Sequence, residues 1–285
     1  MRRLDRSVAL GWHSLTDRVP PRAIARVPVL MYHSVSCDTR PGHPYFETHT
    51  FPQIFRSHLQ YLRSRGYTAV DVNQIEREIA SGACGRIVAL TFDDGFADFY
   101  SNALPLLIEF GFTATLYLVS SLSEKGRSTF HGKELMTWNE IREVQNHRIS
   151  IGSHSMTHPE FYSMTPAAIE RELRASKTVI EDKLGAAVDS FAYPFAFPEP
   201  DRRFIRSFRG LLQGAGYRNG VTTSIGRASA EHDKFFYPRL PVSSWDDLLL
   251  LEAKLAGSYD WMHLPQYLCK LVKVLQKNVV SLSRS

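Results

Sequence analysis

The sequence lacks any long apolar run. No stretch of the chain approaches the roughly 20 apolar residues that a membrane-spanning helix needs. Residues 1–22 also lack the uninterrupted apolar core of a signal peptide, so export by that route is not indicated. We therefore expect a cytoplasmic protein that does not cross the bilayer.

Cysteine is scarce, and the usual motifs of nucleophilic enzymes are absent. The three cysteines, Cys37, Cys84 and Cys269, lie far apart in the chain and offer no disulfide framework. None of them has a local catalytic signature, and there is no Gly-x-Ser-x-Gly sequence. Covalent catalysis by cysteine or serine therefore has no support in the sequence.

The chain does contain alternating strand and helix patterns. With 285 residues, of which 44% are hydrophobic, it can build one large domain with a substantial core. Strands alternating with helices indicate parallel βαβ units and suit a (β/α) barrel. We expect strands near 28–33, 67–71, 86–93, 113–119, 149–153, 189–193 and 219–223, and helices near 52–64, 73–81, 99–110, 137–147, 165–184, 201–215 and 245–256.

The segment Arg86 to Gly95 is the most informative stretch. Its apolar run reads as a buried parallel strand, and it ends in Asp93 and Asp94 followed by a glycine. Ligands of α/β proteins bind at the carboxyl ends of such strands, and two adjacent carboxylates call for a positive partner such as a metal ion. On the dipeptide alone, an ordinary acidic turn remains the alternative.

A second polar cluster follows the expected strand near 149–153. His154 and His158 are four residues apart, and Pro159 favours a loop rather than a helix for this segment. The residues between the histidines include no glutamate, which excludes the H-E-x-x-H motif of metalloproteases. Two histidines and one carboxylate would leave coordination positions open, as in a catalytic metal site.

These motifs resemble the polysaccharide deacetylases, also called the NodB-homology domain or carbohydrate esterase family 4. The resemblance rests on TFDDG at 91–95, SHSMTHP at 153–159 and FAYPF at 191–195, in an order that spans most of residues 27–245. It implies an α/β fold in the form of a distorted barrel of about seven parallel strands. It also implies that Asp93 is the general base, that Asp94, His154 and His158 bind the metal, and that Tyr193, Pro194 and Phe195 form the groove wall and the oxyanion site.

The chain departs from the usual form of this family in two places. Ala192 stands where an arginine is usual, and the late histidine that supplies the general acid is missing. The segment VPVLMYH at 27–33 resembles the rearranged branch that includes the poly-N-acetylglucosamine deacetylases, in which the first strand supplies that histidine. We therefore expect His33 to be the general acid, and Arg239 is a candidate to orient Asp93.

The resemblance implies hydrolysis of an N-acetyl group on a carbohydrate by a metal-activated water. We expect a divalent metal ion, zinc in the first place, with iron, cobalt and nickel as alternatives for this donor set. A non-catalytic glycan-binding protein with the same fold is the alternative that Ala192 and the missing late histidine raise. Nucleic-acid binding is set aside, because the basic residues are not clustered with aromatic ones.

Both ends of the chain have apolar residues at helical spacing beside basic ones. Leu4, Val8, Trp12 and Leu15 recur in this way near the N-terminus, and Leu264, Leu268, Leu271 and Leu275 near the C-terminus. Together with a net charge of +5, they suggest peripheral contact with an anionic membrane, at its inner face. Packing on the barrel and self-association are the alternatives.

We thus divide the chain into an N-terminal basic amphipathic extension (1–26), a barrel (27–256) and a C-terminal basic amphipathic tail (257–285). A cytoplasmic enzyme reaches a mature surface polymer poorly, so we expect an N-acetyl amino sugar on a lipid carrier or a glycan precursor as the substrate. An exported deacetylase of a chitin-like or poly-N-acetylglucosamine polymer is the alternative.

Overall fold

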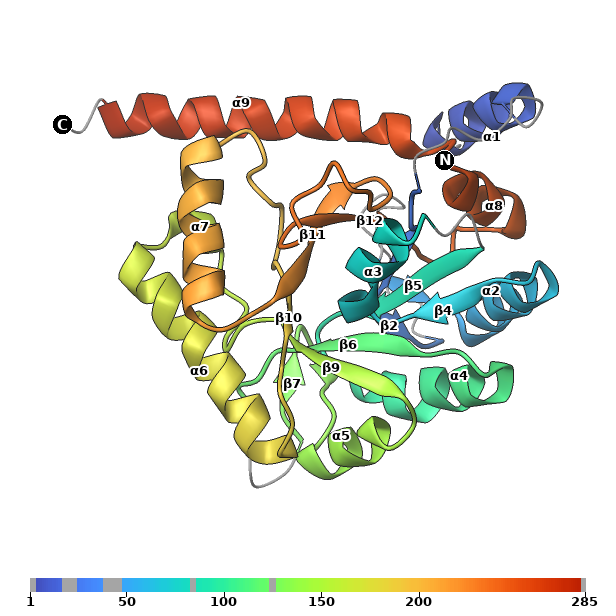
Figure 1. Ribbon diagram of the computed structural model, residues 1–285, viewed down its shortest axis with the longest axis horizontal. Coiled ribbons are helices and arrows are strands. Elements are labelled where there is room, and N and C mark those ends of the chain that lie inside the picture. The colour runs from blue at the N-terminus through green and yellow to red at the C-terminus, as the bar shows by residue number, and fades with distance from the viewer. Residues whose placement is uncertain (1–3, 17–24, 38–47, 83–85, 123–126, 283–285) are drawn as a thin grey trace.

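Seven parallel strands close into a barrel in the computed structural model (Figure 1), as the sequence predicts. The structure describes residues 4–16, 25–37, 48–82, 86–122 and 127–282. The ring closes where β1 pairs with β5. Its order is β1 (Val29–Tyr32), β12 (Tyr237–Pro241), β11 (Asn219–Ile225), β10 (Ser190–Ala192), β9 (Ile149–Ser153), β6 (Ala114–Leu118) and β5 (Ile87–Phe92).

The membership of the ring differs from the sequence prediction at two strands. The strand expected near 67–71 exists as β4 (Thr68–Val70), but it pairs only with the first half of β5, outside the ring. Its place in the ring is taken by β12, which the sequence analysis did not predict. Pro238 and Pro241 lack backbone N–H groups, and prolines in a segment normally indicate a loop rather than a central strand, so the sequence pattern did not predict β12.

Helices surround the barrel and match the predicted ones (Figure 1). Thr137, Thr165, Asp201 and Asp247 each accept a hydrogen bond from a backbone N–H at a helix start, which fixes where four of these helices begin. The surrounding helices are α2 (Pro52–Ser64), α4 (Leu104–Phe110) with a preceding π-helical turn (Phe99–Ala103), α5 (Trp138–Gln145), α6 (Pro166–Leu184), α7 (Arg202–Gly214) and α8 (Leu248–Ala256).

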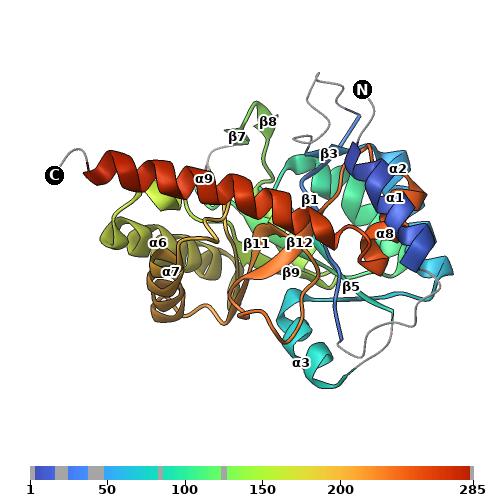
Figure 2. The same cartoon turned by 90° about the horizontal axis from the view of Figure 1, so that it is seen from above.

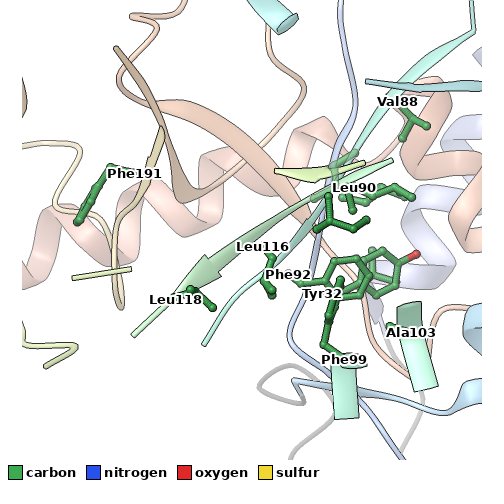
Figure 3. Packing of buried hydrophobic residues seen from close by; sticks show 14 of the residues in the cluster. Tyr32, Val88, Leu90, Phe92, Phe99, Ala103, Leu116, Leu118 and Phe191 are labelled. Carbon is green, nitrogen blue, oxygen red and sulfur yellow. The ribbon is translucent and has the colours of Figure 1, made fainter. Parts of the chain in front are cut away.

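The side chains of β5 alternate between two apolar layers. Val88, Leu90 and Phe92 belong to the large core between the barrel and its helices, where Phe92 stacks on Tyr32 with ring centroids 5.2 Å apart (Figure 3). Ala89 belongs to a second, smaller cluster inside the barrel. Because side chains of a strand alternate in direction, residue 93 falls on the inward-facing series. The strand therefore delivers its first aspartate to the interior of the barrel mouth.

The opposite end of the barrel is closed by a short plug. It consists of a 3₁₀ turn (Val72–Gln74) and α3 (Ile75–Ala80). The buried Val72 lies in the interior cluster, and its N–H donates to Thr115 Oγ1 over 3.2 Å. The Asn219 side chain donates to Asn73 Oδ1 over 2.7 Å. Access to the barrel interior is thus left to the carboxyl ends of the strands.

The two ends of the chain form helices that pack on the barrel domain. Helix α1 (Leu4–Thr16) packs on α8, and α9 (His263–Leu282) packs on β11. No helix among the described residues is long and apolar enough to cross a bilayer. Cys37 and Cys269 are free thiols, and Cys84 lies outside the described residues.

Candidate active site

Asp93 and Asp94 turn apart at the end of β5. Asp94 has a positive φ of 73°, and Gly95 follows with a φ of 77°. A Cβ on Gly95 would lie 2.8 Å from Leu118 Cδ2, so only glycine fits there without a shift. The tight turn leaves both aspartates at the carboxyl-end mouth of the barrel, and the two side chains have different partners.

Arg239 binds Asp93 through both guanidinium Nη atoms. Nη1 donates to Oδ1 and Nη2 to Oδ2, each over 2.7 Å, and both side chains are buried. Arg239 is held in turn by Thr91 Oγ1 and by the carbonyl of Thr222. Burial alone would raise the pKa of Asp93, but the charge and hydrogen bonds of Arg239, with His154 nearby, hold that pKa well below its usual range.

Asp94, His154 and His158 come together as the sequence analysis predicts. Their ligand atoms all lie within 4.8 Å of one another. Asp94 Oδ1 lies 3.6 Å from His154 Nε2 and 3.8 Å from His158 Nε2. This oxygen is buried and has no hydrogen-bond partner among the described residues. A buried carboxylate oxygen facing two imidazole nitrogens fits a cation such as zinc.

The orientation of His154 is set by the backbone of β10. His154 Nδ1 lies 2.8 Å from the carbonyl oxygen of Ala192, so Nδ1 carries the proton and Nε2 is left as an acceptor for a metal ion. The carbonyl of Ala192 thus contributes to the site through a group that any residue would supply. Because the backbone makes this contact, the type of residue at position 192 could not reveal it in the sequence.

The His158 loop is held in an unusual backbone conformation. His158 and Ser155 both have positive φ, at 56° and 69°, and the His158 N–H donates to Ser155 Oγ over 2.9 Å. The carboxylate of Glu172 on α6 accepts from the N–H groups of Met156 and Thr157. Such strained positions persist only where the surroundings fix them, and they are frequent at functional sites. Glu172 is a supporting residue that the sequence analysis missed.

The titration behaviour of the cluster also fits a cation. Burial, together with the charge of Asp93, raises the pKa of Asp94 to about 8. Burial and the neighbouring His154 lower the pKa of His158 to about 3, and burial lowers the pKa of His154 as well. These neutral imidazoles are ready to act as ligands, and a bound cation would offset the cost of ionising Asp94.

His33 lies at the same mouth. It directly follows β1 on the inward-facing series, and its Nε2 lies 3.9 Å from Asp93 Oδ2. Burial lowers the pKa of His33 to about 4, so the imidazole is uncharged at neutral pH. The first strand thus places a histidine beside the aspartate that Arg239 binds.

The segment Tyr193 to Phe195 divides between the interior and the surface. Tyr193 and Pro194 are buried, and the Tyr193 ring packs among Phe161, Phe197 and Phe208. Phe195 is exposed, with a φ of 57°, and its ring centroid lies 4.5 Å from that of His158. Of the three side chains, that of Phe195 is thus the exposed one, and it packs on a residue of the candidate active site.

A hairpin that the sequence analysis did not predict completes the rim. It consists of β7 (Thr129–Phe130) and β8 (Lys133–Glu134). The Phe130 ring lies 5.1 Å from that of His158, on a segment too short to show a strand pattern. Together with Phe195, it surrounds His158 with aromatic surface.

Comparison with known proteins agrees with this geometry. Residues 81–214 match the family described as polysaccharide deacetylase. Over 221 residues the chain is 28% identical to the putative polysaccharide deacetylase YxkH of Bacillus subtilis, a match that covers 77% of this chain and 72% of that protein. It is 32% identical over 159 residues to the poly-beta-1,6-N-acetyl-D-glucosamine N-deacetylase of Escherichia coli K12, which covers 52% of this chain but only 20% of that enzyme.

Solved structures share the fold. The deacetylase PplD of Streptococcus pyogenes superposes with a TM-score of 0.68 at 24% identity, covering 81% of this chain and 98% of that one. IcaB of Ammonifex degensii gives a TM-score of 0.67 at 22% identity, covering 81% and 97%. The chain is therefore similar to the polysaccharide deacetylase family, whose model it matches over residues 81–214.

Proposed function

We propose that this protein is a metal-dependent hydrolase that removes the acetyl group from an N-acetyl amino sugar. The observation that carries the proposal is the pairing of two neighbouring groups at one barrel mouth. Asp94, His154 and His158 form a cluster suited to a metal ion, and Asp93 beside it is kept ionised by Arg239. When bound, a divalent metal ion supplies a water of lowered pKa and polarises the acetyl carbonyl.

Asp93 and His33 are the proposed proton carriers. Asp93 Oδ2 accepts the proton of the attacking water, and His33 Nε2 delivers a proton to the departing amine. Since a pKa of about 4 leaves His33 neutral at pH 7, its proton must arrive during the reaction. Asp93 Oδ2, 3.9 Å away, is the carboxylate positioned to pass it on, and the low pKa of Asp93 favours that transfer.

The Arg239–Asp93 pair also bears on the alternative of a glycan-binding protein without turnover. Ala192 raised that alternative, because the usual partner of the base is missing from β10. Arg239 reaches the same carboxylate from β12, so the chain retains an arginine for its proposed base. This arrangement supports an enzyme.

We further propose that the substrate is an N-acetyl amino sugar carried on a lipid or present as a glycan precursor. The proposal is tested by measuring acetate release from lipid-linked, oligomeric and polymeric N-acetyl sugars, with zinc, iron, cobalt or nickel added to chelator-treated protein. We expect release only with metal, and chiefly from the lipid-linked sugar. Activity confined to polymers would overturn the substrate proposal, and acetate release unaffected by chelator or by Asp93→Asn would overturn the mechanism.

A further inference from the structure

Helices α1 and α9 each carry a row of large apolar side chains on the side that faces away from the protein. In both, the inner face includes buried charged side chains, Asp5 on α1 and Lys270 on α9, beside the small apolar Ala9 and Val274, while the row of large apolar side chains faces solvent. A soluble surface helix normally shows the opposite arrangement, with its apolar stripe against the core. The two stripes therefore need an explanation other than packing on this domain.

The inner face of α9 is fixed by polar contacts to the end of β11. Gln266 accepts from the N–H of Ile225 over 2.9 Å and donates to the carbonyl of Thr223 over 2.8 Å. Lys270 is buried, donates to Ser224 Oγ over 3.0 Å and pairs with Glu199. These contacts set the rotation of α9 about its own axis, so its apolar stripe cannot turn inward without breaking them.

The inner face of α1 is fixed in the same way. Asp5 is buried and accepts from Tyr259 Oη over 2.7 Å. His13 Nδ1 lies 3.2 Å from Ser258 Oγ, and Arg6 pairs with Asp247 at the start of α8. Because Tyr259 and Ser258 lie just before α9, the two helices are anchored to one short segment.

The outward stripes repeat one spacing. Each places four apolar side chains at positions i, i+4, i+8 and i+11, which line one side of a helix. All large hydrophobic side chains exposed among the described residues, apart from Ile108 and Phe195, lie in these helices or in the segment from Trp245 to Trp261 between them. The stripes are Leu4, Val8, Trp12 and Leu15 on α1, and Leu264, Leu268, Val272 and Leu275 on α9. Val272 stands where the sequence predicted Leu271, which is half-buried.

Both helices lie on one side of the barrel domain. They run along the top of Figure 1 and across the face turned to the viewer in Figure 2. The stripes, each opposite its packed side, thus point away from the domain on a shared surface, which we name the α1/α9 face. Large apolar side chains gathered on one exposed face are typical of an interaction site.

The α1/α9 face borders the barrel mouth. Along its length α9 contacts Ile225 at the end of β11, Glu199 in the loop after β10 and Tyr162 in the loop after β9. These last two loops also carry Phe195 and His158 of the candidate active site. A partner seated on the α1/α9 face would therefore lie beside the mouth.

The charges on the two helices identify the kind of partner. Helix α9 has no acidic residue and exposes two of its three lysines, Lys273 and Lys277, while the acidic residue of α1, Asp5, is buried. Lys273 is exposed at the border of the α9 stripe. Apolar stripes bordered by positive charge, with Trp12 in one of them, suit the interface of an anionic bilayer. We propose that the α1/α9 face lies on an anionic membrane surface, with the barrel mouth beside the bilayer.

Vesicle binding tests this proposal without requiring catalysis. The full chain is sedimented with vesicles of phosphatidylcholine alone or with phosphatidylglycerol added, and compared with the double variant Leu268→Glu/Val272→Glu. Ile108→Glu is the matched control, because Ile108 is similarly exposed but lies on α4. We expect binding to the anionic vesicles that salt weakens, and a loss of about tenfold or more in the double variant alone. Circular dichroism and melting curves verify that all three proteins fold.

Two results would overturn the proposal. One is a native chain that binds neither kind of vesicle. The other is concentration-dependent dimerisation of the native chain that the double variant abolishes, with no lipid binding, since a second copy would then cover the stripes. Loss of acetate release with vesicle binding intact would instead count against the proposed chemistry alone.

Discussion

Arg239 on β12 binds both carboxylate oxygens of Asp93 at 2.7 Å, across the intervening strand β1. Replacing Arg239 by Gln removes a buried charge that holds the pKa of Asp93 down, so we expect that pKa to rise. The acidic limb of the pH profile of kcat/KM should then move to higher pH, and stability should fall by about 3 to 5 kcal/mol. Steady-state kinetics against pH and denaturant unfolding measure the two effects.

The matched control for that variant is Arg227→Gln. Arg227 is partly buried and pairs with Asp260 over 3.0 Å rather than with Asp93 or Asp94. The Arg227→Gln protein should be less stable, while the acidic limb of its kcat/KM profile should stay at the same pH. An unchanged profile in a folded Arg239→Gln protein would contradict a positioning role for Arg239.

Removal of the metal should lower the melting temperature as well as the activity. A ligand present at a hundredfold excess over its Kd stabilises the folded state by ~2.7 kcal/mol, which is about 5 °C for a chain of this size. Calorimetry with and without zinc should show this shift in the native chain and in His147→Ala, whose histidine is exposed. It should be absent in Asp94→Asn and His154→Ala. A shift of equal size in all four proteins would place the metal elsewhere.

Gly152 is required by the packing of the barrel interior. A Cβ at this position would lie 2.4 Å from Tyr117 Cδ1 and 3.1 Å from the carbonyl oxygen of Ser190. We expect Gly152→Ala to destabilise the protein by about 1 to 3 kcal/mol, measured by urea unfolding. Gly210→Ala is the control, because Gly210 is helical and exposed with nothing near its missing Cβ. It should stabilise by about 0.5 to 1 kcal/mol.

Acid should weaken the attachment of α9. Burial alone would raise the pKa of Glu199, but the hydrogen bond to His263 and the charge of Lys270 lower it from 4.5 to about 2. A lowered carboxyl pKa contributes stability above pH 4.5, and this contribution is lost as the pH falls toward 2. Glu199→Gln should thus cost about 2 kcal/mol at neutral pH and progressively less in acid. A difference from the native chain that is independent of pH would contradict this account.

The sequence alone determined the fold class and which side chains gather at the barrel mouth. Asp93, Asp94, His33, His154 and His158 each follow an apolar run, and parallel strands bring all such ends to one mouth. The local sequence was sufficient for this prediction, because each polar residue lies within a few positions of the apolar run that forms its strand. The spacing of apolar residues likewise predicted the helices, and capping residues mark where several of them begin.

Only the tertiary structure decided what depends on distant pairs. The sequence could offer Arg239 as a candidate, but its contact with Asp93 depends on barrel closure, which places β5 beside β1 and so within reach of β12 on the other side of β1. Likewise, helical spacing predicts an apolar stripe at each end of the chain, whereas the buried Asp5 and Lys270 decide which way that stripe faces. The reason is that a periodic pattern defines the faces of a helix, while partners far away in the chain fix its rotation.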